Sequence, residues 1–388
     1  MNLWPERSVT AAYLHIPFCV RKCLYCDFVS FPGVNQVRQI AYTNQLAAEI
    51  DRTADQVSSG VLPLDAAPLQ TVFFGGGTPS ILPADRLAGL LSRLSDRFGL
   101  TADAEVTLEA NPGTTSPEGL AACRTAGFNR ISFGLQSASP LLLKSLGRIH
   151  DAGDFRSSVQ MAVAAGFERI SADIMFGLPD QSEKDIEDTL QLIFSLPINH
   201  VSFYGLILEE GTPLFDAYQH QPASIRLPDD EAERSQYHLI RRRLAENGFE
   251  HYEISNSARP GEQCQHNLVY WHGLPYYGFG VAAHSYLAGM RRANPATLEA
   301  YAGTWQPLVL EQVSRDEGMK EMLLLGLRLV NGVAVDDFYR RFGVTLDERF
   351  QDEIGSLQAR GLLMVDQERI RLSETGLDLA NQVFQAFV

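Results

Sequence analysis

Short apolar segments alternate with longer amphipathic segments through the first half of the chain, and this alternation limits the fold more than any other feature. Five crossovers in succession predict a parallel sheet covered by helices. The expected strands are AAYLHI (11–16), QTVFF (70–74), AEVTLE (104–109), NRISFG (129–134), RISADIMF (169–176) and HVSFYGL (200–206). The expected helices lie near residues 36–52, 84–98, 117–126, 151–165 and 182–195.

Six such units are too few to close an eight-stranded barrel. We therefore predict an α/β fold, a partial (βα)6 TIM-like barrel, with a doubly wound sheet as the alternative that the pattern leaves open. The 388 residues exceed one typical domain. We expect the barrel over residues 1–225 and an extension rich in Gly, His and aromatic residues over 226–313 that completes its core. A smaller helical, winged-helix-like domain is expected over 314–388.

Most of the polar residues that could take part in chemistry stand at or just after the ends of the predicted strands. They are a cysteine loop after the first strand, GGGTPS after the second, EANPG at the third, GLQS at the fourth and Asp173 within the fifth. Carboxyl ends of parallel strands meet at one edge of a sheet, where active sites form in such folds. The sequence therefore predicts a single site at this edge.

The cysteine loop holds Cys19, Cys23 and Cys26, three of the 5 cysteines of the chain. Three thiolates can hold a [4Fe–4S] cluster and leave its fourth iron open to chelate S-adenosylmethionine. The alternative is a tetrahedral zinc site in which His15 is the fourth ligand. A zinc site would not explain the glycine run or the polar residues at the other strand ends.

Several motifs together resemble the radical S-adenosylmethionine superfamily, and within it the heme chaperones of the coproporphyrinogen dehydrogenase-like branch. They are YLHIPFC, FFGGGTPS, LEANPG, GLQS, DIMFGLP and YEIS followed by QHNLVYW. The resemblance extends over nearly the whole chain, its C-terminal part included. It implies a [4Fe–4S] cluster, S-adenosylmethionine and heme as cofactors, and Cys19, Cys23 and Cys26 match the cluster ligands.

The resemblance also implies where S-adenosylmethionine is held. Tyr13 matches a tyrosine beside the cofactor, and Tyr25 matches an aromatic residue that packs against the adenine. The remaining matches are Gly76, Gly77 and Thr78 along the methionine end, the polar contacts Glu109, Gln136, Arg148 and Asp173, and Leu206 at the adenine. By charge, Arg148 suits the methionine carboxylate, Glu109 the ammonium group, and Gln136 and Asp173 the ribose hydroxyls.

Two functions compete within this branch. The oxygen-independent coproporphyrinogen III dehydrogenase carries a further cysteine two residues after the third, where this chain has Phe28. It also has a longer leader that folds over its active site, whereas little sequence precedes Cys19 here. Both departures favour a chaperone that delivers heme to acceptor proteins, and neither tests whether S-adenosylmethionine is cleaved. A zinc-stabilised binding protein without redox chemistry is a third hypothesis.

A heme site is expected in the segment 252–286. His266 opens HNLVYW, which fits the HNxxYW signature of the chaperone group, and a neutral imidazole can bind heme iron. Cys264, His272 and His284 are further candidates. The alternative for His266 is a structural histidine among aromatic residues.

Composition bears on the partners. The formal charge of -15 disfavours nucleic acid, and no apolar run is long enough to span a membrane, which leaves peripheral membrane contact open. The first residues lack the pattern of an export signal, and clustered cysteines are typical of metal sites in the reducing cytoplasm, where we expect this protein. Heme, heme-accepting proteins and an electron donor are the expected partners.

Overall fold

The computed structural model describes residues 4–220 and 225–388, and most of this chain is arranged around one curved sheet. Six strands of the sheet are parallel neighbours in chain order. They are β1 (Ala11–Ile16), β4 (Leu69–Gly76), β5 (Leu100–Ala110), β6 (Arg130–Gln136), β7 (Arg169–Phe176) and β8 (His200–Gly205). The predicted α/β partial barrel is confirmed.

Strands from the middle of the chain extend the sheet at both edges. The strand β11 (Tyr277–Phe279) pairs in parallel with β1. At the other edge, β10 (Asn256–Ala258) pairs antiparallel with β8, and β9 (Glu250–Glu253) pairs with β10. The sheet therefore has nine strands in the order β11-β1-β4-β5-β6-β7-β8-β10-β9.

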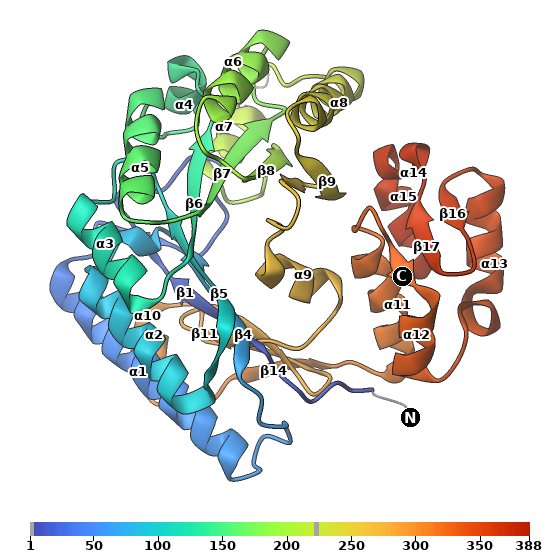
Figure 1. Ribbon diagram of the computed structural model, residues 1–388, viewed down its shortest axis with the longest axis horizontal. Helices are drawn as coiled ribbons and strands as arrows, with labels where there is room; N and C mark the ends of the chain where they lie inside the picture. The colour runs from blue at the N-terminus through green and yellow to red at the C-terminus, as the bar shows by residue number, and fades with distance from the viewer. Residues whose placement is uncertain (1–3, 221–224) are drawn as a thin grey trace.

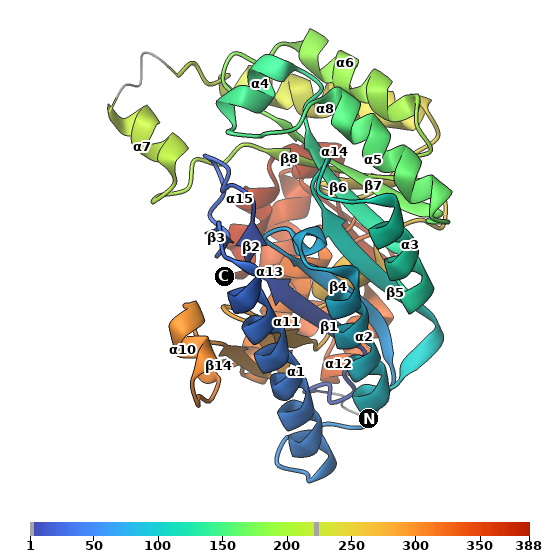
Figure 2. The same ribbon diagram turned by 90° about the vertical axis from the view of Figure 1, so that its left-hand side faces the viewer.

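Helices cover the outer face of the sheet, as Figure 2 shows for α1, α2, α3 and α5. Capping boxes begin two of the helices, where Asp151 precedes α5 and Ser182 precedes α6. The connecting helices are α1 (Gln36–Ser58), α2 (Ala84–Phe98), α3 (Pro117–Ala126), α4 (Pro140–Ser145), α5 (Ala152–Ala164), α6 (Glu183–Phe194), α7 (Pro213–His220) and α8 (Asp230–Glu246). A short turn of 3-10 helix, Pro79–Ile81, follows β4.

Alternate residues of each strand give the two faces of the sheet different chemistry. On β1, Leu14 and Ile16 belong to the apolar core shared with the helices, whereas Tyr13 and His15 do not. The same alternation on β7 places Ile170, Ala172 and Ile174 in the core and leaves the buried Ser171 and the half-buried Asp173 between them. The inner face of the barrel is therefore rich in polar side chains, which is what a site inside it requires.

The residues after β10 form one helix and a small sheet beside the barrel. The helix α9 (Gln265–Trp271) lies between the barrel strands and the C-terminal domain (Figure 1). The small sheet contains β12 (His284–Leu287), β13 (Met290–Ala293) and β14 (Leu308–Gln312), with α10 (Leu298–Ala302) between the last two strands. The strands β2 (Phe18–Cys19) and β3 (Phe31–Pro32) form a separate pair that brackets the cysteine loop.

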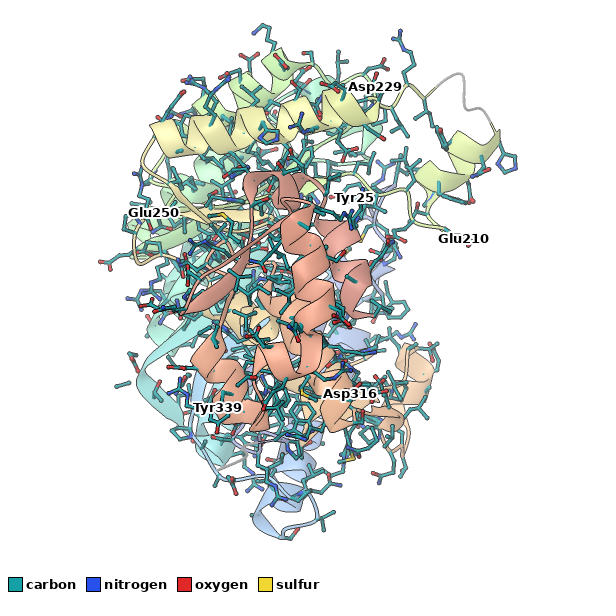
Figure 3. The ribbon with its side chains drawn as sticks, turned by 90° about the vertical axis from the view of Figure 1, so that its right-hand side faces the viewer. Tyr25, Glu210, Asp229, Glu250, Asp316 and Tyr339 are labelled. Carbon is teal, nitrogen blue, oxygen red and sulfur yellow. The ribbon has the colours of Figure 1, made fainter. Side chains whose placement is uncertain are left out.

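The C-terminal residues have an apolar core of their own, centred on Phe338, Phe342 and Phe350. Its elements are α11 (Arg315–Gly326), β15 (Val333–Ala334), α12 (Val335–Phe342), α13 (Leu346–Ala359), β16 (Leu363–Val365), β17 (Arg369–Leu372), α14 (Glu374–Asp378) and α15 (Ala380–Phe384). Figure 3 looks onto this domain, with Asp316 at the start of α11 and Tyr339 on α12 in the foreground. Helices followed by a β16–β17 hairpin are the winged-helix-like pattern that the sequence predicts.

Backbone hydrogen bonds join the C-terminal domain to the edge of the barrel sheet. The Ile254 N–H donates to Arg328 O over 3.1 Å, and the Val330 N–H donates to Tyr252 O over 3.0 Å. Asp378 adds an ion pair with Arg234 on α8 at 2.7 Å. Within the described ranges, no helix combines the length and the apolar character needed to cross a membrane.

Candidate cofactor site

The carboxyl ends of the central strands surround a cavity of about 460 Å³. Its wall includes the three clustered cysteines and residues that follow β4, β5, β6 and β8. Of the residues predicted to hold S-adenosylmethionine, those on this wall are Tyr25, Gly76, Gly77, Thr78, Glu109, Gln136, Arg148, Asp173 and Leu206. Cys19 and Leu206, which are 187 positions apart in the sequence, thus lie on the wall of one cavity, while the individual roles of the wall residues remain predictions.

The cysteine loop is held from both sides. Cys19 closes the short strand β2, and its carbonyl oxygen accepts a hydrogen bond of 3.3 Å from Gly33 N–H. The Leu24 N–H donates to Leu146 O over 3.0 Å. All three thiols are free and partly buried, and burial raises the pKa of Cys19 and raises that of Cys26 to about 11. Binding as thiolates would therefore release protons.

Hydrogen-bond donors point at two of the three sulfur atoms. Thr78 Oγ1 donates to Cys19 Sγ over 3.6 Å, and Arg148 Nη1 donates to Cys23 Sγ over 3.4 Å. Asn111 connects these two donors, because its Nδ2 donates to Thr78 Oγ1 over 2.8 Å and its Oδ1 accepts from Arg148 Nη2 over 2.7 Å. Such donors stabilise negative charge on sulfur, so the donor set fits thiolates that carry a metal cluster.

The arrangement of the cysteines does not suit the zinc alternative. His15, the fourth ligand of that hypothesis, has both ring nitrogens engaged. Its Nε2 donates to Val29 O over 2.8 Å, so Nδ1 of the neutral ring accepts from Tyr13 OH over 3.0 Å. Across residues 4–220 and 225–388, no three His, Cys, Asp or Glu side chains converge on a point where one ion could bind them all. Ligands of one zinc ion must converge in this way, whereas three thiolates on three irons need not.

Glycine residues make room for the wall beside the cysteines. A Cβ atom on Gly77 would lie 2.7 Å from Phe18 O, so a larger residue would push the segment after β4 away from the loop that carries Cys19. A Cβ atom on Gly134 would lie 2.9 Å from Arg148 Nη2 and 3.1 Å from Asn111 Oδ1. Glycine at both positions therefore permits the close approach of backbone and polar groups that the cavity wall shows.

Two half-buried carboxyl groups on the wall give the inner part of the cavity an acidic character. Glu109 accepts a hydrogen bond of 3.1 Å from Gly76 N–H, and Asp173 accepts one of 3.0 Å from Ser132 Oγ. Burial, and after it the negative charge of Asp173, raise the pKa of Glu109 to about 8 against the lowering effect of the hydrogen bond from Gly76. A cationic ligand would relieve the repulsion between these groups, which suits the ammonium and sulfonium charges of S-adenosylmethionine.

The strand β6 ends in a strained backbone at the cavity. Gln136 has a φ of 66°, which is uncommon for a residue with a side chain, and the pairing of β6 with β7 shifts register between Gly134 and Gln136. The Arg148 guanidinium reaches back to this strand and also donates to the Gly134 carbonyl oxygen. The polar groups from β5, β6 and the segment after α4 thus fix one another.

Apolar side chains form the remaining side of the cavity. Tyr25 and Leu206 pack on a small buried cluster that includes Leu146, Met175 and Leu178. This flat apolar wall suits the predicted adenine. Tyr13 lies deeper in the barrel, where its ring stacks on Phe73 with centroids 6.2 Å apart, and it is not among the residues that form the cavity wall.

The predicted heme ligand lies elsewhere, in the interior of the barrel. His266 is only 1% exposed, and its two ring nitrogens are hydrogen-bonded to Thr71 Oγ1 at 2.9 Å and to Tyr270 OH at 2.8 Å. Cys264 is also 1% exposed, with its Sγ 3.6 Å from Glu105 Oε1. An iron atom at either residue would have to replace these contacts.

Sequence reasoning missed several residues of the cavity wall. Asn111 stands two residues after Glu109 in the motif EANPG, but an amide has no charge to match to the cofactor, so the motif drew attention to the glutamate alone. Tyr204 stands two residues after Ser202 on β8, so the two side chains share one face of the strand, and Tyr204 lies on the cavity wall. The two-residue period of the strand would have indicated this position. Phe28 and Ile207 lie at the cavity with 62% and 69% of their surfaces exposed, which no pattern predicted.

Comparison with protein families finds two matching models. Residues 13–193 match the radical SAM superfamily, and residues 313–379 match the HemN C-terminal domain. The fold also resembles a solved structure of coproporphyrinogen III oxidase (HemN) from Escherichia coli, a radical SAM enzyme, with a TM-score of 0.79. That similarity covers 99% of this chain and 91% of the other at 22% sequence identity, so it concerns the fold alone.

Sequence relatives extend over nearly the whole chain. A protein named heme chaperone HemW from Lactococcus lactis is 34% identical over 381 residues, with 97% of each chain covered. A protein of the same name from Mycobacterium tuberculosis is 37% identical over 386 residues, which cover 97% of this chain and 94% of the relative. A third of that name, from Escherichia coli, is 39% identical over 272 residues, or 70% of this chain and 68% of the relative.

Proposed function

Because this chain belongs to the HemW family of radical S-adenosylmethionine proteins, we propose that it binds heme and delivers it to heme-accepting proteins. The observation that carries the proposal is similarity along 97% of the chain to relatives named heme chaperone, rather than similarity confined to the barrel. The C-terminal domain is included in that similarity, so the whole architecture supports the proposal.

Membership of the radical SAM superfamily implies a [4Fe–4S] cluster and S-adenosylmethionine. Cys19, Cys23 and Cys26 would hold the cluster, which supplies single electrons to S-adenosylmethionine when both are bound. Arg148 would then pair with the methionine carboxylate, and Glu109 would accept from the ammonium group. Gln136 and Asp173 would take the ribose hydroxyls.

One position on the cavity wall favours a chaperone over a decarboxylating enzyme. Phe28 stands where the resemblance to the dehydrogenases implies a further cysteine, and 62% of its surface is exposed beside the cluster loop. A phenyl ring offers neither a thiol nor a proton for chemistry on a substrate. This site can therefore present its cofactors without the group that distinguishes the dehydrogenases.

The proposed partners follow from the same function. Heme-accepting proteins receive the heme, and an electron donor reduces the cluster. The net charge of -15 argues against nucleic acid, and the group of unpaired cysteines supports the reducing cytoplasm as the compartment. Contact with a membrane surface would be peripheral.

Heme titration under anaerobic conditions tests the proposal. The cluster-loaded protein should give a saturable change in heme absorbance that ends near one heme per chain. The heme-loaded protein, immobilised on beads, should then pass its heme to a heme-free cytochrome in the supernatant. A linear titration without saturation would contradict heme binding, and heme that stays on the beads would contradict delivery.

A further inference from the structure

The side chain of Asn111 contacts both of the groups that donate to cysteine sulfur. Asn111 is the first residue after β5 and lies, partly buried, on the wall of the cofactor cavity. Its Nδ2 donates to Thr78 Oγ1 over 2.8 Å, and its Oδ1 accepts from Arg148 Nη2 over 2.7 Å. One uncharged amide therefore joins two donors that reach the cavity from different parts of the sheet.

The chemistry of these neighbours decides which way the amide faces. A guanidinium offers only N–H donors, so Arg148 requires the amide oxygen, and the amide NH2 group must face Thr78. The Thr78 oxygen then accepts, and its single hydrogen is left to point elsewhere. Cys19 Sγ lies 3.6 Å from that oxygen and accepts this hydrogen. The direction of the Thr78 hydroxyl therefore depends on the amide of Asn111.

The backbone holds the amide and the hydroxyl in place. The carbonyl oxygen of Asn111 accepts from Thr114 N–H over 3.1 Å and from Thr114 Oγ1 over 2.6 Å. Pro112 follows, and a proline restricts the backbone of the residue before it. The Thr78 N–H donates to Phe18 O over 2.7 Å, in the strand that carries Cys19. The amide therefore acts from a fixed support on a fixed neighbour.

The same amide fixes the guanidinium of Arg148. Its Nη2 donates both to Asn111 Oδ1 and to the Gly134 carbonyl oxygen, and its Nη1 donates to Cys23 Sγ over 3.4 Å. Two acceptors on one nitrogen set the plane of the group. Its Nε is buried and has no partner in the described part of the chain. A buried donor without a partner is costly, and a ligand carboxylate would satisfy it.

We propose that Asn111 is a positioning residue of the cofactor site, which directs the Thr78 hydroxyl toward Cys19 and holds the Arg148 guanidinium for the cofactor carboxylate. The inference rests on the proposed cofactor site and is independent of heme delivery. Asparagine suits the position because one planar group carries both a donor and an acceptor. Aspartate would accept from both neighbours, and the Thr78 hydroxyl would turn from the sulfur to the carboxylate.

Redox titration of the reconstituted cluster in four proteins tests the first role. They are the wild type, Thr78→Val, Asn111→Asp and the double variant. Thr78→Val alone should make the potential more negative, because the sulfur loses a donor. In the Asn111→Asp background the same change should leave the potential where it is, because the hydroxyl already faces the carboxylate. The comparison within each background cancels the charge of the aspartate. An equal shift in both backgrounds, or no shift in either, would overturn the proposal.

The affinity for S-adenosylmethionine tests the second role, also where Asn111→Asp takes up no cluster. Asn111→Leu keeps the size of the side chain and adds no charge, and it should weaken binding about tenfold with the cluster absorbance intact. Thr114→Val is the matched control, because it loosens the backbone of Asn111 and leaves the amide in place. Unchanged affinity in Asn111→Leu, or an equal loss in Thr114→Val, would overturn the proposal. A wild-type protein that binds neither cluster nor S-adenosylmethionine would contradict the cofactor site itself.

Discussion

Replacement of Thr78 by valine should shift the reduction potential of the cluster without disturbing its ligands. Thr78 is 1% exposed, and its hydroxyl joins Cys19 Sγ, 3.6 Å away, to the amide of Asn111, 2.8 Å away. Thr78→Val keeps the shape of the side chain and removes only the hydroxyl. The reduced cluster carries one more negative charge than the oxidised cluster, so the lost donor destabilises the reduced form more.

The size of the shift follows from the strength of one hydrogen bond. A net contribution of about 1 kcal/mol corresponds to about 40 mV for a one-electron couple, so the potential should become more negative by about that amount. The same change leaves a buried Asn111 Nδ2 donor without its acceptor, which should lower the free energy of unfolding by about 1–3 kcal/mol. The two effects have different readouts and can be measured separately.

The assay is a redox titration of the reconstituted cluster, followed by the paramagnetic signal of its reduced form in the absence of S-adenosylmethionine. Thr114→Val is the matched control, because Thr114 Oγ1 donates to Asn111 O over 2.6 Å but contacts no cysteine. Thr114→Val should leave the potential where it is in the wild type. A Thr78→Val potential equal to that of the wild type would refute the reasoning.

Three further predictions follow from the two regions of the barrel. Cys23→Ala should abolish the cluster absorbance after anaerobic reconstitution, and full retention of iron and sulfide would contradict the cluster assignment. Arg148→Ala should weaken S-adenosylmethionine binding by roughly ten- to a hundredfold with the cluster intact, measured by equilibrium dialysis, whereas unchanged affinity would remove Arg148 from the site. Burial lowers the pKa of His266 to about 3 from 6.5, so the unfolded chain takes up this proton first as the pH falls, and stability is lost from about pH 6.5 downward. Between pH 6.5 and pH 5 the free energy of unfolding of the wild type, measured in urea, should fall by about 2 kcal/mol more than that of His266→Gln. An equal fall in both proteins would contradict the burial of His266 as a neutral ring.

The parallel strands could be predicted because each is an apolar run bounded by turn residues. AAYLHI and RISADIMF coincide with β1 (Ala11–Ile16) and β7 (Arg169–Phe176), and the helix 84–98 coincides with α2. The helix expected over 36–52 continues to Ser58. The prediction ended it too early because polar residues near its end, such as Asp51 and Asp55, weaken the amphipathic pattern. The short strands at the edges of the main sheet, β9, β10 and β11, have 3 or 4 residues, too few to show the alternation of a strand in the sequence.

The candidate site could be predicted as far as charge and strand ends indicate it. Glu109 stands near the end of β5, Arg148 lies in the connection after β6, and Asp173 lies within β7 with its side chain on the inner face. The parallel sheet brings the three together. The environment of His266 could not be predicted, because Thr71, its hydrogen-bond partner, is 195 residues away in the sequence. Burial of this kind depends on the closure of the barrel by α9, which no local pattern shows.

The most direct measurement of the central claim is the product analysis of a single anaerobic reaction. The cluster-loaded wild-type protein is incubated with coproporphyrinogen III, S-adenosylmethionine and a reductant, and the porphyrin products are oxidised and separated by chromatography. If the protein is a heme chaperone, coproporphyrin should be recovered in full and no protoporphyrin should form. Repeated turnover to protoporphyrinogen would contradict the account and identify the chain as a decarboxylating enzyme.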